Sequence, residues 1–333
     1  MIVLKNNAYG IGSKKIIKIL KECNVKWIVY NTYDEYQKDK EYLGGFKILI
    51  LSSVLINQIE CDENLYYSIN NYKDVMNVLN VKKKINVHIQ VDTGMNRVGI
   101  RSIDVYKKIL NDLIKNENIN IDGIYTHFGS NYDEYEYYNK QINKFIEYVK
   151  LYNFKNIHSA ATSSLHKNIY GNLVRVGLAI YGYGNPYIGL HPSIKYTTKL
   201  INQFILLPNE TLGYNQGYIA NKNTLVGVVP IGYNDITNID YLYYNNIKLQ
   251  IIGNRCMNHT FIKLPYKINN LSSLLVLPKS DIIYKEEYNW YYILTSIKNI
   301  KKIYIRRFNY DIPTIFKRTN KKNRKYVIRG RSN

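Results

Sequence analysis

Several residues that could do chemistry come at or directly after short apolar runs of the chain. Lys5 ends the run Ile-Val-Leu-Lys, His127 follows "GIYT", and Arg175 lies in "LVRVGLAIYG". A lysine amine can act as a base or as a covalent nucleophile, and a histidine can move protons. Such residues are uncommon in buried strands, so they predict a functional site at the ends of the strands that carry them. On position alone, Lys5 fits better as a surface lysine whose stem covers apolar surface.

Apolar runs alternate with amphipathic stretches through the first half of the chain. The expected strands are residues 2–5, 26–31, 47–52, 65–69, 85–92, 121–127, 156–161 and 174–181. Helical patterns such as "SKKIIKILKECN" and "IDVYKKILNDLIKN" lie between them. Nearly continuous apolar strands separated by helices are typical of parallel sheets covered on both faces. Eight such units in about 180 residues predict a compact (β/α)₈ barrel of the TIM type, with a doubly wound sheet as the alternative.

The pattern changes at about residue 190. Runs such as "TLVGVVPIG", "IKLQIIG" and "HTFIKL" are β-like and are separated by Asn, Gly and Pro. We therefore predict a barrel domain at residues 1–190, a mainly β domain at residues 191–316 and a basic tail at residues 317–333. The tail carries eight Lys or Arg residues and no acid.

Composition limits the class of protein. With 333 residues, 46% of them hydrophobic, the chain can bury a substantial core. The formal charge of +21 is spread along the chain, so nucleic acid is not the expected partner, although the tail keeps an RNA or anionic-surface role open as an alternative. The three cysteines form no C-x-x-C pair and indicate neither a disulfide framework nor a zinc site. No signal segment or membrane-length apolar run is present, which predicts a cytoplasmic protein.

Seven segments of the chain resemble, in order, the motifs of the pyridoxal 5′-phosphate (PLP)-dependent alanine racemases of fold type III. The first is "VLKNNAYGIG", which is similar to the lysine motif V-[VL]-K-x-N-A-Y-G-x-G. The others are "VDTGMNRVGI", "THFGSNYDE", "LVRVGLAIYGY", "LGYNQGY", "VVPIGYND" and "IGNRCMN". Ordered matches of this kind cover essentially the whole chain, so the resemblance is specific.

The resemblance implies an enzyme that interconverts L-alanine and D-alanine for peptidoglycan synthesis. Lys5 would hold PLP as a Schiff base and serve as one catalytic base, and Tyr214 would be the other base on the opposite face. In the family this tyrosine comes from the other subunit, so a homodimer with shared active sites is expected.

The resemblance also assigns binding residues. Arg175 would contact the pyridine nitrogen of PLP, and His127 would pack against its ring. The phosphate would be held by Tyr9, Thr162, Tyr233 and the backbone N–H groups near Gly177 and Leu178. Substrate would be bound by Arg97, by the backbone of Met257 and by Tyr291 as the gate. Arg97 and Arg175 would also favour the phenolate of Tyr214.

The match departs from the family at several positions. Only four residues precede Lys5 here, whereas family members carry roughly 35, which include a helix and a strand. Either the start codon is misassigned or the barrel lacks its usual opening helix. Gln90 replaces a lysine that is often carbamylated, Ala161 replaces Asn, Val176 replaces Pro and Asn258 replaces Asp. The alternatives are a racemase of serine or lysine, and a degenerate PLP-binding paralogue without turnover. The amino-acid decarboxylases that share the barrel are a weaker alternative.

Overall fold

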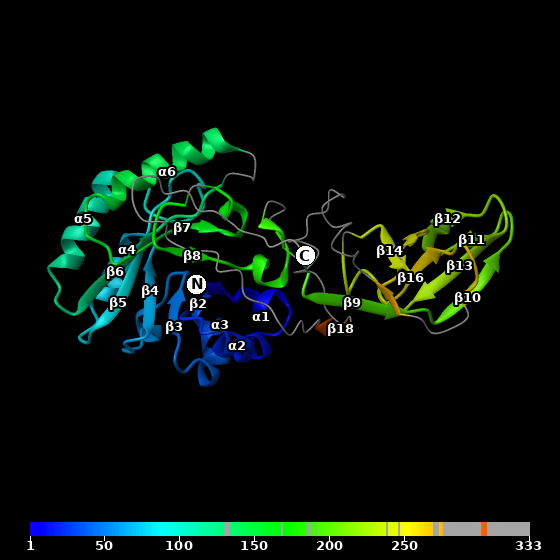
Figure 1. The fold of residues 1–333 in the computed structure, drawn as a ribbon, viewed down its shortest axis with the longest axis horizontal. Coiled ribbons are helices and arrows are strands. Elements are labelled where there is room, and N and C mark those ends of the chain that lie inside the picture. Colours follow the sequence, from blue (N-terminus) through cyan, green and yellow to red (C-terminus); the bar gives the residue numbers. More distant parts are fainter. Residues whose placement is uncertain are drawn as a thin grey trace, which may run out of the picture. The chain divides into compact units, whose positions relative to one another are not determined.

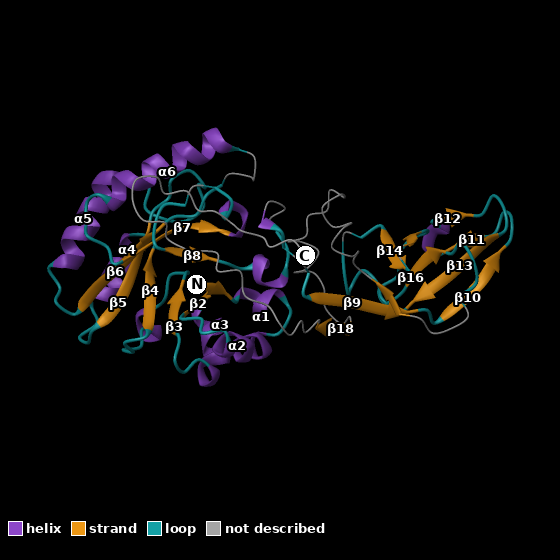
Figure 2. Cartoon of the chain, in the orientation of Figure 1, coloured by secondary structure: helices purple, strands orange, loops and turns teal. Residues whose placement is uncertain are grey.

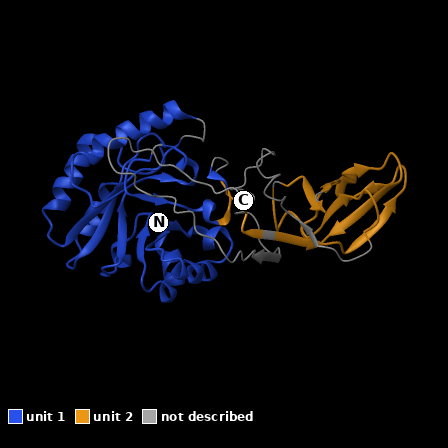
Figure 3. Cartoon of the chain, viewed as in Figure 1, with its two compact units in different colours: residues 1–180, 187–189, 314–333 blue, residues 181–186, 190–313 orange. Residues whose placement is uncertain are grey.

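The computed structural model describes residues 1–129, 134–167, 169–184, 188–190, 192–237, 239–245 and 247–268, together with strand residues 273–275 and 301–304 (Figure 1). These residues divide into two compact units (Figure 3). Residues 1–180 and 188–189 belong to the first unit. Residues 181–184 and the described residues from 190 onward belong to the second.

The first unit is a barrel of eight parallel strands whose neighbours follow the order of the sequence. The strands are β1 (Ile2–Val3), β2 (Trp27–Tyr30), β3 (Lys47–Ile50), β4 (Leu65–Ile69), β5 (Ile85–Gln90), β6 (Ile119–Tyr125), β7 (Asn156–Ala161) and β8 (Leu173–Arg175). Ile2 pairs in parallel with Val176, and the N–H of Val3 donates to the carbonyl of Val176 at 2.8 Å, which joins the last strand to the first. The predicted (β/α)₈ barrel is confirmed, and the doubly wound alternative is wrong.

Helices lie between the strands, as the amphipathic stretches predict (Figure 2). They are α1 (Lys5–Tyr9), α2 (Ser13–Glu22), α3 (Tyr33–Asp39), α4 (Tyr72–Leu79), α5 (Ile103–Ile114) and α6 (Tyr135–Val149). Short 3₁₀ turns are η1 (Lys40–Tyr42), η2 (Ile56–Gln58), η3 (Thr162–Ser164) and η4 (Leu178–Tyr181). The short α1 and α3 were not predicted, although Thr32 and Glu35 form a capping box at the start of α3. The backbone of α1 is left-handed, so this element is a turn and not a regular helix.

Strand β5 shows how the barrel separates its two faces. Val87 and Ile89 belong to the apolar layer shared with α4, α5 and α6. His88 and Gln90 alternate with them and are also buried. Because successive side chains of a strand point to opposite faces, these polar residues face the barrel interior. The ring of Trp27 from β2 lies 5.5 Å from that of His88, which agrees with this placement.

Most of the predicted strands extend one or more residues too far at their carboxyl ends, and the first and the eighth bear on the candidate site. The first was expected to reach Lys5, but β1 ends at Val3, and the chain then enters a turn in which residues 6–9 have positive φ. The eighth was expected at residues 174–181, but β8 ends at Arg175 and residues 178–181 form η4. There the N–H groups of Gly177 and Ala179 donate to Thr162 Oγ1 instead of continuing the sheet. Both departures occur where the candidate site lies.

The second unit is mainly β, as predicted. Its strands are β9 (Ile194–Lys199), β10 (Asn202–Leu206), β11 (Thr211–Leu212), β12 (Tyr218–Ile219), β13 (Thr224–Val229), β14 (Tyr241–Tyr244), β15 (Ile247–Gln250), β16 (Thr260–Lys263), β17 (Ser273–Leu275) and β18 (Lys301–Tyr304). They form the sheets β10-β13-β16, β11-β12 and β15-β14-β17-β9-β18, and the pairs are antiparallel. A 3₁₀ turn, η6 (Tyr214–Gln216), lies between β11 and β12.

Two kinds of feature are absent from the described residues. None of their helices combines the length and apolar character needed to cross a bilayer. Nor do their His, Cys, Asp and Glu side chains gather in groups of three or more that could hold a metal ion. The three cysteines are free thiols.

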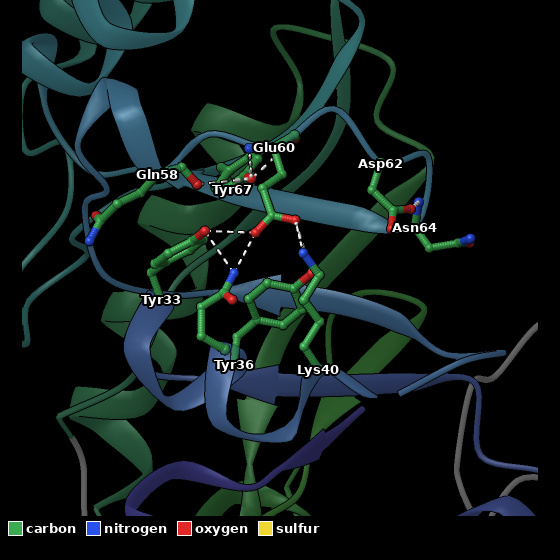
Figure 4. Close-up of polar contacts among 9 residues, drawn as sticks. Tyr33, Tyr36, Lys40, Gln58, Glu60, Asp62, Asn64 and Tyr67 are labelled. Atoms are coloured by element: carbon green, nitrogen blue, oxygen red, sulfur yellow. Dashed lines mark hydrogen bonds and ion pairs between the residues drawn. The ribbon is translucent and has the colours of Figure 1, made fainter. Parts of the chain in front are cut away.

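A polar cluster on the barrel joins α3 to the connection between β3 and β4 (Figure 4). The carboxylate of Glu60 accepts hydrogen bonds from Tyr33 at 2.6 Å, from Lys40 at 2.5 Å and from Gln37. Its own N–H donates to the hydroxyl of Tyr67 at 2.7 Å. Burial on its own would raise the pKa of Glu60, but the hydrogen bonds from Lys40 and Tyr33 lower it below its ordinary value.

We expect Glu60→Gln to lower the free energy of unfolding by about 1 kcal/mol at pH 7, because the site is partly exposed to solvent. A lowered folded-state pKa stabilises the protein above the unfolded pKa of about 4.3 and loses that effect as the pH falls through the folded value. The difference between variant and wild type should therefore shrink below about pH 4. Thermal unfolding across pH checks this, with exposed Glu117→Gln as the control. A difference that stays constant with pH would contradict it.

Candidate active site

Lys5 lies just beyond the carboxyl end of β1, directly before a left-handed turn formed by residues 6–9. Asn6, Asn7, Ala8 and Tyr9 have φ between 52° and 56°, and Gly10 follows at 77°. Asparagine tolerates this region, but alanine and tyrosine do so at a cost of roughly 1–2 kcal/mol each. The turn is therefore a strained segment that the surrounding structure must hold.

Tyr9, Thr162 and Gly177 form a cradle beside this turn. Tyr9 is buried, and Lys5 Nζ lies 5.9 Å from the centre of its ring. The Tyr9 hydroxyl occupies the space next to Gly177 so closely that a Cβ on that residue would lie 2.0 Å from it. The N–H groups of Gly177 and Ala179 point to Thr162 Oγ1 at 3.3 and 3.5 Å. Hydroxyl and N–H donors that converge in this way suit an anionic group such as a phosphate.

Arg175 brings a buried positive charge to the same barrel. Its Nη1 lies 2.6 Å from His158 Nδ1, and the guanidinium also donates to the carbonyls of His158 at 2.8 Å and Thr126 at 2.5 Å. Its guanidinium lies 5.0 Å from the ring of Tyr125. Burial lowers the pKa of Arg175 to about 10, so the side chain stays charged at neutral pH.

Two neutral histidines connect Arg175 to a carboxylate. His158 Nε2 lies 2.8 Å from His88 Nδ1, and His88 Nε2 lies 3.0 Å from Asp122 Oδ2. Burial lowers the pKa of both histidines, against the opposing effect of Asp122 on His88. Burial would raise the pKa of Asp122, but hydrogen bonds from His88 and Asn156 lower it.

These partners determine the tautomer of each ring. An ionised Asp122 only accepts, so His88 carries its proton on Nε2 and accepts at Nδ1. His158 must then carry its proton on Nε2, which leaves its Nδ1 to accept from the donor-only guanidinium of Arg175. Sequence reasoning overlooked His88 and Asp122 in this chain. The strict alternation of β5 was the signal that could have placed His88 in the interior.

Arg97 and His127 lie at the same end of the barrel. The carboxylate of Asp92 accepts from the N–H groups of Gly94, Asn96 and Arg97 at 2.9, 3.0 and 3.1 Å, and this wraps the loop that presents the exposed Arg97. Burial lowers the pKa of His127 to about 3, and the charges of Arg175, Arg97 and Lys5 act in the same direction.

Gln90 replaces the expected lysine and is fully engaged. Its Nε2 donates to the carbonyl of Val98 at 3.0 Å, and its Oε1 accepts from the hydroxyl of Tyr125 at 2.8 Å. Tyr125 OH also lies 2.8 Å from Ser68 Oγ. A neutral amide thus joins the Arg97 loop to the barrel interior.

The second unit brings three other predicted residues onto adjoining loops. The Tyr233 N–H donates to the carbonyl of Cys256 at 3.1 Å, and the carbonyl of Met257 accepts from Asn234 at 3.2 Å. Asn254 Nδ2 donates to the carbonyl of Tyr214 at 2.8 Å. The side chains of Tyr214, Tyr233 and Met257 are more than half exposed, at 68%, 51% and 55%. Tyr291 lies outside the described residues.

Arg255 holds these loops together. It donates to the carbonyls of Gly232 at 2.9 Å and Ile236 at 2.8 Å, and to Thr260 Oγ1 at 3.1 Å. The guanidinium therefore adds to the backbone hydrogen bonds that join the loops of Tyr233 and Met257. Sequence reasoning gave this arginine no role.

Known proteins match both parts of the chain. Residues 1–186 match the family described as "Alanine racemase, N-terminal domain", and residues 194–301 match "Alanine racemase, C-terminal domain". The alanine racemase of Fusobacterium nucleatum is 32% identical over 286 residues, which cover 80% of each chain. The alanine racemase of Listeria monocytogenes is 28% identical over 298 residues, which cover 83% of this chain and 80% of the relative.

Solved structures share the fold. The crystal structure of alanine racemase from E. faecalis superposes with a TM-score of 0.80 at 23% identity, covering 90% of this chain and 88% of that one. That of Bartonella henselae, which has covalently bound pyridoxal phosphate, gives 0.79 at 21% identity and covers 89% of each chain.

The lowered pKa of His127 predicts an acid-sensitive barrel. Below about pH 6.5 an unfolded histidine takes up a proton, whereas folded His127 stays neutral until about pH 3, so stability falls as the pH drops through this window. We expect His127→Gln to flatten that fall. Thermal unfolding of cofactor-free protein from pH 7.5 to 4.5 measures it, and the difference at pH 7.5, where both forms are neutral, gives the packing contribution alone. Parallel curves for variant and wild type would contradict the expectation.

Proposed function

This chain belongs to the alanine racemase family, and from that premise we propose that it interconverts L-alanine and D-alanine with PLP bound at the open end of its barrel. The observation that carries the proposal is the grouping of Lys5, the cradle of Tyr9, Thr162 and Gly177, and the buried Arg175 in one unit. The amine of Lys5 matches the aldehyde of this cofactor, the anion cradle matches its phosphate, and the cation of Arg175 matches its ring nitrogen.

The residues present fit the cofactor. Gly177 leaves room where any Cβ would collide with the Tyr9 hydroxyl, and Thr162 already gathers two backbone N–H groups at the same place. Tyr9, Thr162 and the backbone at Gly177 and Leu178 would hold the phosphate. Lys5 would hold the aldehyde carbon, and His127 would pack against the ring. When bound, PLP supplies the electron sink that makes the substrate α-proton acidic.

Arg175 would act on the ring nitrogen as a donor that does not give up its proton. Its pKa of about 10 keeps it charged at neutral pH, and His158 Nδ1 orients it by accepting from Nη1. A nitrogen that faces a guanidinium stays unprotonated, which weakens the electron sink and disfavours side reactions such as transamination. Arg97, beside His127 and Arg175, would bind the substrate carboxylate, and the backbone of Met257 would add a donor.

Two bases on opposite faces would move the α-proton. Lys5 would take or return it on one face, and the hydroxyl of Tyr214 would do so on the other. The cations Arg97 and Arg175 would favour the phenolate form that Tyr214 needs in order to act as a base.

We propose a homodimer in which Tyr214 enters the partner's site. In support, the side chains of Tyr214, Tyr233 and Met257 are exposed on adjoining loops of the second unit, although their proposed chemistry needs a site that excludes water. Tyr291 would be the gate. The D-alanine product would serve peptidoglycan synthesis in the cytoplasm. No observation favours serine, lysine or a turnover-free paralogue as the alternative.

Lys5→Ala should abolish cofactor attachment and racemase activity. The wild-type protein should show the visible absorbance of lysine-bound PLP, and borohydride should fix the label on the peptide that contains Lys5. Exposed Lys18→Ala, on α2, is the matched control and should keep both properties. Labelling of a different lysine in the wild type would refute the assignment.

Mixing inactive subunits tests the shared site. Lys5→Ala and Tyr214→Phe should each be inactive alone, because each lacks one base. After subunit exchange at equal amounts, half of the dimers are mixed and one of their two sites is intact, so activity should return to about one quarter of wild type. Coupled detection of D-alanine formation measures the rate. If no activity returns although exchange is demonstrated, both bases belong to one subunit or one is misassigned.

A further inference from the structure

Helix α3 carries two carboxylates one turn apart, Glu35 and Asp39. Glu35 contacts the left-handed turn that follows Lys5 directly, and Asp39 is linked to it through Ser13. We propose that these side chains form a clamp that holds the turn in its strained conformation, so that Glu35 and Asp39 are positioning residues for Lys5. The inference rests on the proposed function for the importance of Lys5. The clamp itself is a property of the cofactor-free chain.

Glu35 holds the backbone at the first residue of the turn. Its Oε1 accepts from the N–H of Asn6 at 2.6 Å, and its Oε2 accepts from the N–H groups of Asn31 at 2.9 Å and Thr32 at 3.2 Å. The N–H of Asn6 belongs to the same planar peptide group as the carbonyl of Lys5. Glu35 therefore fixes the peptide that joins Lys5 to the turn, and ties it to the end of β2. Hydrogen bonds to an ionised acceptor are the stronger kind.

Asp39 holds the second residue of the turn through a serine. The hydroxyl of Ser13 lies 2.8 Å from Asp39 Oδ1 and 3.1 Å from Asn7 Oδ1, and the N–H of Ser13 donates to Asn7 Oδ1 at 2.9 Å. Asp39 Oδ2 accepts from the hydroxyl of Tyr30 at 2.9 Å. Asp39, Ser13 and Tyr30 are buried. The side chain of Asn7 is thus anchored to α3 inside the protein.

The turn needs hydrogen bonds from outside itself, such as those of Glu35 and Ser13, to keep its conformation. Ala8 and Tyr9 have positive φ, and neither side chain can satisfy its own backbone as asparagine does. The backbone bonds of this segment, such as those from the N–H of Ala8 to the Leu4 carbonyl, of Gly10 to the Asn6 carbonyl and of Gly12 to the Asn7 carbonyl, close about one turn only. An isolated turn of this length does not hold itself, so external contacts decide whether it persists.

Helix capping is the competing explanation for Glu35, and one variant separates it from clamping. Glu35 also forms the capping box of α3, in which its N–H donates to Thr32 Oγ1 at 3.3 Å. Thr32→Ala removes this cap and leaves the Glu35–Asn6 bond in place. Asp34→Asn removes a charge from the same helical turn at an exposed position. The clamp therefore predicts an effect for Glu35→Gln that neither of these variants reproduces.

The test is amide hydrogen exchange of residues 6–10 in the full-length chain without cofactor, followed by titration with PLP. Glu35→Gln keeps the size of the side chain but has one acceptor oxygen, so it should speed exchange in the turn at least tenfold. It should also raise the PLP concentration needed for half-saturation about tenfold, while exchange in α4, α5 and α6 stays as in the wild type. Asp39→Asn should speed exchange at Gly12 and Ser13, which follow the turn.

Three results would overturn the clamp. They are wild-type exchange of residues 6–10 in Glu35→Gln, an equal increase in Thr32→Ala, and faster exchange spread over the whole barrel. Failure of the proposed function would instead be seen in the wild type, as PLP that never attaches to Lys5. Because the exchange measurement needs no cofactor, the two failures are distinguishable.

Discussion

A strained turn directly after the first barrel strand is the constraint on which the site depends. Residues 6–9 take a left-handed conformation that L-residues avoid, and the turn therefore exists only because hydrogen bonds from outside hold it. The turn follows β1 closely, so Lys5 lies near the carboxyl end of that strand. It also places the hydroxyl of Tyr9 in contact with Gly177. Lys5 and the cradle are thus two products of the same backbone conformation. A regular helix in this place would carry Tyr9 elsewhere.

The second unit uses a similar design. Tyr214 precedes two residues with positive φ, Asn215 and Gln216, and its carbonyl is held by Asn254. The next residue, Arg255, joins the loop of Met257 to that of Tyr233 by donating to backbone carbonyls. In both units a functional side chain stands on irregular backbone, and a partly buried polar group supplies the order that regular hydrogen bonding would otherwise give.

The barrel could be predicted from the sequence because its signals are local. Apolar runs separated by amphipathic stretches indicate parallel strands and covering helices, and the ordered motifs indicate the family. The strand ends near Lys5 and Arg175 could not be predicted from the sequence, because each depends on a distant partner. Glu35 contacts the turn after Lys5, and Thr162 accepts from Gly177 after Arg175. The capping residues Thr32 and Glu35 were a sequence signal for the start of α3, but the helix is too short to show a periodic apolar pattern. His88 was missed because its role depends on His158 and Asp122, which lie on other strands.

The fixed tautomers behind Arg175 have a consequence for where protons can travel. Each ring nitrogen of His88 and His158 already has a partner, and all donors point the same way, from the guanidinium toward Asp122. A single proton passed along this row would leave a neutral guanidinium and a protonated Asp122, and would reverse the direction of every hydrogen bond. A second proton could follow only after both imidazoles turned over within a packed interior, next to the stacked ring of Tyr125. The row therefore holds the charge of Arg175 in place and does not support repeated proton transfer.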